Sequence, residues 1–98
     1  IRRFVSALKE QGIRECRVIL FGSHARGNAG VDSDIDLVVV SDDFEGKDFW
    51  ERTDILTEAI FQVYEPLEVI AVTNREWEKG DFFINECLRT DKYEEIAL

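Results

Sequence analysis

The chain contains 98 residues, of which 45% are hydrophobic and 34% are charged, and its formal net charge is −9. This length predicts a single domain over residues 1–98, and the composition is typical of a soluble globular protein. No apolar run approaches the roughly 18 residues of a membrane span, and the sequence starts without a recognisable signal peptide. Direct polynucleotide binding is not expected, because nucleic-acid binders normally carry a basic face and the basic residues here are scattered.

The two cysteines indicate a reducing environment. Cys16 and Cys87 form neither a C-x-x-C pair nor a zinc-type spacing. We therefore expect both to be reduced residues in or beside the core. With no secretory signal, a cytoplasmic location is expected.

The first half of the chain predicts one helix and two strands. Residues 1–11 carry apolar side chains at helical spacing, and Gly12 is a plausible C-terminal stop. Residues 14–21 read as a strand that ends in the apolar run VILF, and the run LVVV at 37–40 reads as a second.

The second half predicts helices around a third strand. Residues 41–47 read as a solvated polar loop. A helix is expected over 48–64, with an apolar stripe made of Phe49, Leu56, Ala59, Ile60 and Val63. Residues 67–72 form the third predicted strand, and the capping box Thr73-x-x-Glu76 begins another helix.

The last expected helix begins at Asp81, and residues 91–98 are predicted to fray or extend it. The resulting order is α, β, glycine-rich turn, β, α, β, α. This order predicts an α/β domain with a small sheet of about three strands covered by helices.

Residues 22–34 carry more polar chemistry than a connection between two strands needs. Gly22 follows the first strand and permits a close approach of the backbone to a ligand. Ser23 can cap a short helix whose first N–H groups would bind an anion, and Arg26 could hold a phosphate in bidentate fashion. The end of the first strand is therefore predicted to cradle phosphate.

Two aspartates stand at the start of the second strand. Because side chains alternate along a strand, Asp34 and Asp36 are expected on one face, with Ile35 and Leu37 turned into the core. Two carboxylates on one face repel each other unless a cation lies between them. Mg²⁺ is usually held by one or two carboxylates plus substrate phosphates, so the pair predicts a metal that carries a nucleotide.

Two other motifs are excluded. The stretch begins like a P-loop, but Asn28 and Ala29 stand where Lys and Ser/Thr are required. The alternating aspartates imitate an EF-hand loop, but Leu37 and Asp43 stand where Gly and Glu are required. A polar hairpin-like connection with a solvated acidic end is the remaining structural alternative.

The spacing of Gly22, Ser23, Asp34 and Asp36, which is GS, ten residues and then D-x-D, resembles the signature of the DNA polymerase β-type nucleotidyltransferase superfamily. The fuller pattern GSHARG…SDIDL resembles the minimal nucleotidyltransferases that accompany HEPN partners in prokaryotes. The motif covers residues 22–37, while length and element order agree over the whole chain. The resemblance implies a mixed sheet of the polymerase β-type core.

The resemblance also implies a reaction, the transfer of a nucleoside monophosphate from an NTP to an acceptor hydroxyl with release of pyrophosphate. Asp34 and Asp36 would hold one or two Mg²⁺ ions, with Mn²⁺ as a substitute. Metal ions of this kind offset developing charge and align the attacking and leaving oxygens. Glu68 interrupts an apolar strand and must be exposed, paired or ligated. The resemblance implies that it is the third carboxylate of the site, and the alternative is a strand residue that faces water.

The same resemblance assigns the phosphate contacts. Gly22 and Ser23 would hold the β- and γ-phosphates, with Arg26 supporting them. Ser33 would orient the neighbouring aspartate or cap the turn.

The acceptor is expected on another chain, because no segment is left over for an acceptor-binding domain. The resemblance implies a HEPN-type protein, often a ribonuclease toxin, that receives AMP from ATP on a tyrosine, so that this chain acts as an antitoxin. A homo-oligomer could supply the acceptor surface instead. The rival hypotheses are a catalytically silent subunit that neutralises its partner by contact, and an enzyme that modifies a small molecule.

Overall fold

The computed structural model describes residues 2–21, 35–63, 66–79 and 94–96. Their helices and strands follow one another as α1 (Arg2–Glu10), β1 (Arg17–Phe21), β2 (Ile35–Val40), the 3₁₀ turn η1 (Asp42–Phe44), α3 (Phe49–Val63), β3 (Leu67–Val72), α4 (Asn74–Lys79) and β4 (Glu94–Ile96). No helix among these is long and apolar enough to cross a membrane.

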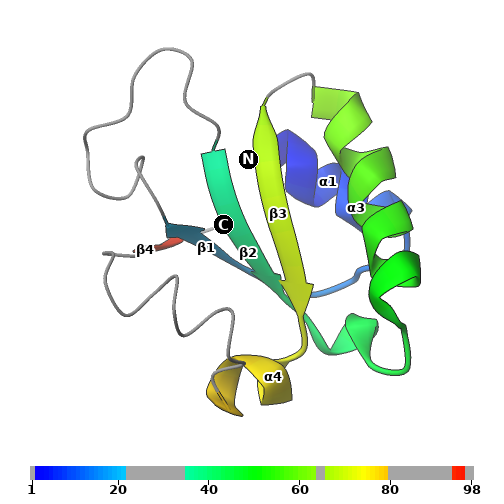
Figure 1. Cartoon of the computed structure of the whole chain (residues 1–98). Coiled ribbons are helices and arrows are strands. Elements are labelled where there is room, and N and C mark those ends of the chain that lie inside the picture. Colours follow the sequence, from blue (N-terminus) through cyan, green and yellow to red (C-terminus); the bar gives the residue numbers. More distant parts are fainter. Residues whose placement is uncertain (1, 22–34, 64–65, 80–93, 97–98) are drawn as a thin grey trace.

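The strands form one mixed sheet in the order β3-β2-β1-β4. β1 runs antiparallel to β2 and β4, whereas β2 and β3 are parallel. Helices α1 and α3 lie together on one side of this sheet, and α4 lies at the end of β3 (Figure 1). The predicted α/β class with a small mixed sheet is therefore confirmed.

The described sheet has four strands, one more than the three or so that were predicted, and the additional strand is formed by acidic residues near the C-terminus. Instead of extending a helix, Glu94–Ile96 forms β4, which pairs with β1 so that Ile96 faces Val18. Arg17 of β1 also forms an ion pair with Glu95, with 2.6 Å between guanidinium nitrogen and carboxylate oxygen. So short and polar a strand has no periodicity of its own, and only the partner strand defines it.

The sheet is buried on both faces, in the alternating pattern expected of strands. Leu37 and Val39 of β2 belong to the larger core, with residues of α1 and α3. Val38 and Val40 belong to a second cluster on the opposite face, against which Trp77 of α4 packs. β2 is thus the central, most buried strand of the molecule.

Gly12 ends α1 as expected. Its φ of +97° is left-handed, its N–H donates to the carbonyl of Lys9 at 3.1 Å, and the next N–H, of Ile13, donates to Leu8 at 3.0 Å. These bonds define a Schellman motif, in which the two flanking apolar residues normally touch. Leu8 and Ile13 are both buried in the larger core, so the stop is also a packing contact.

Helix α3 confirms the predicted span but corrects its stripe. Leu56, Ala59 and Val63 are buried, whereas Phe49 at the first position is 67% exposed. Phe49 is the first residue of the helix and lines a pocket beside Val69 and Ile70 of β3 rather than entering the core. Trp50 is 72% exposed beside it, and the two rings meet edge to face with centroids 5.1 Å apart.

Residues 41–47, which were expected to form a solvated loop, instead contain a 3₁₀ turn that is hydrogen-bonded to residues before β1. Phe44 is fully buried within η1. A carboxylate oxygen of Asp43 accepts the N–H groups of Arg14 at 2.7 Å and Glu15 at 3.4 Å. These two hydrogen bonds hold the pKa of Asp43 below its ordinary range, and the bond from Arg14 has the larger effect. The bonded residues are 29 and 28 positions apart in the sequence, so a local sequence pattern could not predict these bonds.

The capping box before α4 is confirmed. The Glu76 N–H donates to the Thr73 hydroxyl at 3.1 Å, and the Thr73 N–H donates to the Glu76 carboxylate at 2.8 Å. The helix expected from Asp81 and the cysteine at 87 lie outside the described residues. Cys16 is a free, half-buried thiol just before β1, and burial raises its pKa.

Candidate active site

Asp36 and Glu68 occupy register positions of neighbouring parallel strands. Neighbouring strands lie about 4.8 Å apart, and residues at matched positions of a parallel pair project to the same face. The structure therefore places Glu68 beside the strand that carries Asp36, the arrangement that a role as third carboxylate requires. The two side chains come from the N-terminal ends of β2 and β3.

This pair lies on the face of the sheet opposite α1 and α3. Ile35 and Leu37, which flank Asp36 in sequence, pack toward the α1 and α3 side, as the alternation predicted. Asp36 is half-buried and Glu68 is exposed. On the same face, Phe21 and Val38 are buried next to them, so the carboxylates border an apolar surface while remaining accessible to a ligand.

The two residues that flank the glycine-rich segment lie at this end of the sheet. The chain leaves β1 at Phe21, whose register partner on β2 is Asp36, and it enters β2 at Ile35. Ile35 in turn donates its N–H to the carbonyl of Pro66, which precedes β3, at 2.8 Å. Phe21 and Ile35, the described residues that flank residues 22–34, therefore both lie beside Asp36.

The remaining sequence-predicted site residues are Gly22, Ser23, Arg26, Ser33 and Asp34. All of them lie outside the described residues. Their assignment to phosphate and metal stays a prediction. The structure brings together Asp36 and Glu68 and places the two ends of the segment that carries the others.

The donor chemistry of the pair fits a hard divalent cation. Carboxylate oxygens are the ligands that Mg²⁺ prefers, and it usually takes one or two of them together with phosphate and water. Over the ranges 2–21, 35–63, 66–79 and 94–96, no three His, Cys, Asp or Glu residues cluster into a metal site. The pair thus offers two ligands, and the other predicted ligand, Asp34, lies outside the described residues.

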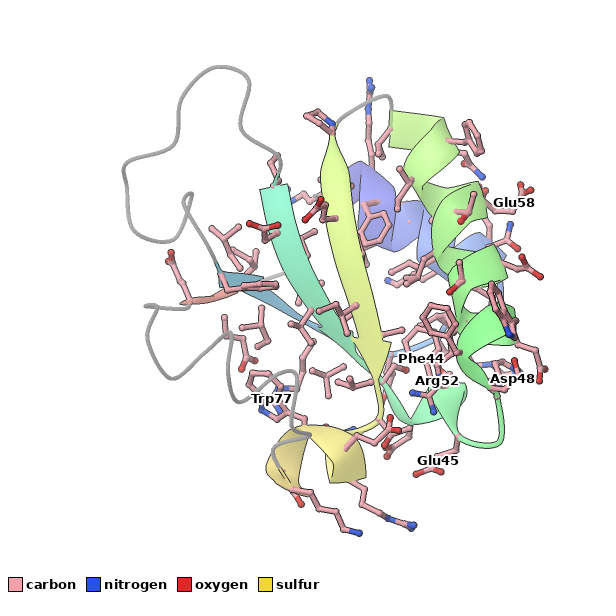
Figure 2. All side chains as sticks on the ribbon, viewed as in Figure 1. Phe44, Glu45, Asp48, Arg52, Glu58 and Trp77 are labelled. Atoms are coloured by element: carbon pink, nitrogen blue, oxygen red, sulfur yellow. The ribbon has the colours of Figure 1, made fainter. Side chains whose placement is uncertain are left out.

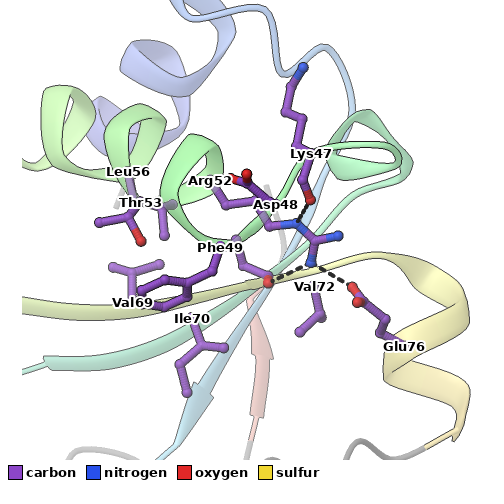
Figure 3. Close-up of a pocket in the computed structure, with 11 residues that line it drawn as sticks. Lys47, Asp48, Phe49, Arg52, Thr53, Leu56, Val69, Ile70, Val72 and Glu76 are labelled. Carbon is purple, nitrogen blue, oxygen red and sulfur yellow. Dashed lines mark hydrogen bonds and ion pairs between the residues drawn. The ribbon is translucent and has the colours of Figure 1, made fainter.

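Sequence reasoning missed a second polar cluster, at the opposite end of β3. The guanidinium of Arg52 donates to the carbonyls of Lys47 at 3.0 Å and Ala71 at 3.2 Å, and to the Glu76 carboxylate at 2.6 Å (Figure 3). Burial alone would raise the pKa of Glu76, but the bonds from Thr73 and Arg52 outweigh it and lower that pKa. The cluster joins α3, β3 and α4, and the only local sequence signal for it was the capping box.

The fold and the carboxylate pair define a class of α/β domains in which a mixed sheet presents acidic residues from adjacent strands beside a glycine-rich segment. A family model described as a nucleotidyltransferase domain matches residues 1–93. The chain belongs to this nucleotidyltransferase family.

Relatives agree with this assignment. Over 47 residues the chain is 49% identical to a Methanocaldococcus jannaschii protein named putative protein adenylyltransferase MJ0604, a match that covers 46% of this chain and 47% of that protein. The matched segment thus spans about half the length of the curated relative.

Solved structures share the fold at low identity. A crystal structure of a putative nucleotidyltransferase has a TM-score of 0.62 and 22% identity, covering 98% of this chain and 97% of that one. A second, from Sulfolobus solfataricus, has a TM-score of 0.54 and 22% identity, covering 80% and 77%. A structure described as a toxin-antitoxin with AMP-PNP has a TM-score of 0.54 and 20% identity, covering 71% and 55%.

Proposed function

We propose that the chain transfers a nucleoside monophosphate, AMP from ATP, to a hydroxyl group of a partner protein. The observation that carries the proposal is the register of Asp36 with Glu68, which brings two carboxylates to one face, beside the two residues that flank the glycine-rich segment. Membership of the nucleotidyltransferase family supports the reaction class.

The reaction is a displacement at phosphorus. The acceptor oxygen bonds to the α-phosphorus, the bond to the pyrophosphate oxygen breaks, and the hydroxyl proton leaves to a carboxylate or to water. Bound Mg²⁺ would supply charge neutralisation at the phosphates. Asp34, Asp36 and Glu68 would hold the metal and thereby orient the triphosphate. Gly22, Ser23 and Arg26 would bind the β- and γ-phosphates, and Ser33 would position Asp34.

The choice of ATP and of a protein acceptor draws on relatives. The Methanocaldococcus jannaschii protein is named as an adenylyltransferase of proteins, and one structural neighbour is a toxin-antitoxin with AMP-PNP. The motif resemblance adds a HEPN-type toxin as partner and a tyrosine as acceptor. In this proposal the chain acts as an antitoxin that modifies its partner.

The experiment uses ATP labelled at the α- or the γ-phosphate. Wild type, Asp36→Asn and Glu68→Gln are incubated with Mg²⁺ and the protein encoded by the neighbouring gene. Label from the α-phosphate alone should appear on the partner with wild type, and each variant should reduce the rate by at least about 100-fold, as loss of a transition-state electrostatic contact does. Asp54→Asn, an exposed change on α3, is the control and should keep the wild-type rate.

The rival function is neutralisation by contact. If wild type and both variants silence the partner equally and no label is transferred, the contact-only antitoxin is the better account. Label from the γ-phosphate would instead indicate a kinase and overturn the assignment of nucleotidyl transfer.

A further inference from the structure

Helices α1 and α3 together cover one side of the sheet, and each exposes a charged face (Figure 1). A hollow of about 350 Å³ lies between the two helices. It is lined by Arg2, Arg3, Ser6, Ala7 and Glu10 of α1 and by Gln62 of α3. The exposed residues of the two helices therefore meet at this hollow and form one surface, which we call the helix face.

The half of the helix face that α1 contributes is mainly basic. The apolar residues of α1 are buried in the larger core, which leaves Arg2, Arg3 and Lys9 exposed on the opposite side of the helix. Glu10 is the one acidic residue of this helix. Within the described part of the chain, none of the three cations forms an ion pair. Their charges are therefore available to a partner.

The half that α3 contributes has the opposite charge. Every charged residue on the exposed face of α3 is acidic, and Glu51 and Glu58 are among them. Glu58 extends away from the sheet (Figure 2). Arg52, the basic residue of α3, is instead turned toward β3, where it donates to the Ala71 carbonyl and pairs with Glu76.

Two exposed aromatic residues lie on the acidic half. Trp50 is 72% and Phe61 is 69% exposed. Because they are 11 residues apart, three helical turns bring them to the same side of α3, about 16 Å from each other. The nine residues of α1 span about 13 Å. One α1 helix therefore fits between the two aromatic rings, whose faces can accept arginine guanidinium groups.

The basic and acidic halves of the helix face are thus complementary to each other, and both belong to the same chain. We propose that two copies of this chain dock through their helix faces, with α1 of each copy lying on α3 of the other. A twofold rotation makes this contact twice, so the dimer is closed. Arg2 and Arg3 of one copy meet Glu58 and the aromatic rings of the other.

The dimer leaves both candidate active sites open. Asp36 and Glu68 lie on the face of the sheet opposite α1 and α3, so the two carboxylate pairs point away from the interface. Neither nucleotide binding nor transfer by each chain requires the second copy. The inference therefore goes beyond the proposed function and does not depend on it.

The size of the helix face predicts a weak dimer. The longer helix is about 22 Å long and each helix is about 10 Å wide, which gives about 450 Å² per copy. This area lies at the low end of specific interfaces, so we expect a Kd between about 10 µM and 1 mM. The net charge of −9 opposes association, but salt at physiological strength screens charges beyond about 8 Å, whereas ions in contact are closer.

The first test measures the mass of the wild-type chain by sedimentation between about 10 µM and 2 mM at physiological salt. The mass should rise with concentration and level off toward that of two chains. A chain that remains a single copy at about 2 mM would overturn the proposal and leave the helix face to a helix of another protein. A mass that grows beyond two chains would overturn the closed dimer.

The second test reverses the charge on one helix at a time. One variant carries Arg2→Glu and Arg3→Glu, and the other carries Glu58→Lys. Each variant should weaken its own dimer at least about tenfold, because like charges then face each other. An equimolar mixture should associate at least about fivefold more tightly than either variant alone, because one of the two contacts is then native and the other is reversed on both sides.

Net charge alone predicts a different result. Glu58→Lys makes the chain two units less negative than −9, so general repulsion would let this variant associate more tightly than wild type. Tighter association of Glu58→Lys would therefore overturn the docking of α1 on α3. A mixture that associates no more tightly than the separate variants would overturn it as well.

The third test uses three aromatic residues of similar exposure. Trp50→Ala and Phe61→Ala should each weaken the dimer at least about tenfold, as loss of an aromatic anchor does. Phe49→Ala is the matched control, with a change of less than about twofold, because Phe49 lies about 100° around the helix and lines the pocket beside β3. Equal effects of all three changes would overturn the assigned face.

Mg-ATP binding separates this inference from the proposed function. All of these changes lie on the side of the sheet away from Asp36 and Glu68, so each variant should bind Mg-ATP as wild type does. Circular dichroism checks that each variant is folded. Loss of the dimer in a folded variant with normal Mg-ATP binding supports the interface, whereas a wild-type dimer without Mg-ATP binding would contradict only the proposed function.

Discussion

Two carboxylates at matched positions of parallel strands form the core of the proposed site. Asp36 and Glu68 contribute negative charge to one face, beside a buried apolar surface. Such a pair is unfavourable by itself and becomes favourable when a divalent cation binds. Under the proposed function, the pair would exchange some stability of the metal-free domain for affinity toward a metal with its nucleotide.

The proposed metal site predicts that Asp36→Asn has opposite effects on thermal stability with and without metal. Without metal, the variant should unfold at the same temperature as wild type or higher, because carboxylate repulsion is relieved. With Mg-ATP at about 100 times its Kd, wild type should gain about 2.7 kcal/mol, and the variant should gain much less. Thermal unfolding with and without Mg-ATP measures both effects. Asp54→Asn is the control, and an undiminished gain in Asp36→Asn would contradict the metal site.

At the scale of elements, the polar cluster around Arg52 links three segments that the sequence separates. Arg52 on α3 reaches the end of β3 and the first turn of α4, where Glu76 also closes the capping box with Thr73. One carboxylate thus serves both a helix cap and an ion pair. It holds the short helix α4 against the sheet, where Trp77 packs.

The lowered pKa of Glu76 predicts how this link depends on pH. A carboxyl group whose pKa is lower in the folded than in the unfolded state stabilises fully above its ordinary value, here 4.5, and its contribution disappears as the pH falls through the folded value. Glu76→Gln should lower stability at pH 7 and should reduce the further loss on acidification. Urea unfolding midpoints at neutral pH and near pH 3 measure this difference. A variant that loses as much stability as wild type on acidification would show that Glu76 is not one of the responsible groups.

For the molecule as a whole, the site rests on its best-packed strand. β2 lies between β1 and β3 and is buried on both faces beyond Asp36. Its position is fixed by α1 and α3 on one face and by the second apolar cluster on the other. The packing of such a strand anchors the backbone that carries Asp36, as the proposed catalysis by positioning would require.

This architecture predicts that core and site can be separated by mutation. Leu37→Ala, which removes a fully buried side chain of β2, should cost about 2–5 kcal/mol of unfolding free energy. Leu67→Ala, at the half-buried start of the edge strand β3, should cost distinctly less. Urea unfolding with an unchanged slope measures both losses. Equal costs would mean that β2 is not the better-packed strand.

Local sequence patterns correctly predicted the structural features that depend on residues close together in the sequence. The span of α3, the run of β3, the glycine that ends α1 and the capping box before α4 all appear in the structure as predicted. Each depends on residues within one or two turns of each other. The alternation that turns Ile35 and Leu37 away from Asp36 is equally local, since it follows from strand geometry.

The sequence by itself therefore determined the α/β class, most of the elements and the aspartate-bearing motif, because these depend on short-range periodicity and spacing. Only the tertiary structure decided that Glu68 stands beside Asp36, that the acidic Glu94–Ile96 is a strand and that Asp43 ties a turn to Arg14. It also decided that Phe49 is exposed, although its helical position suggested the core. In each of these cases the deciding contact, or its absence among the described residues, involves segments far apart in the chain, and no local pattern records which segments will meet.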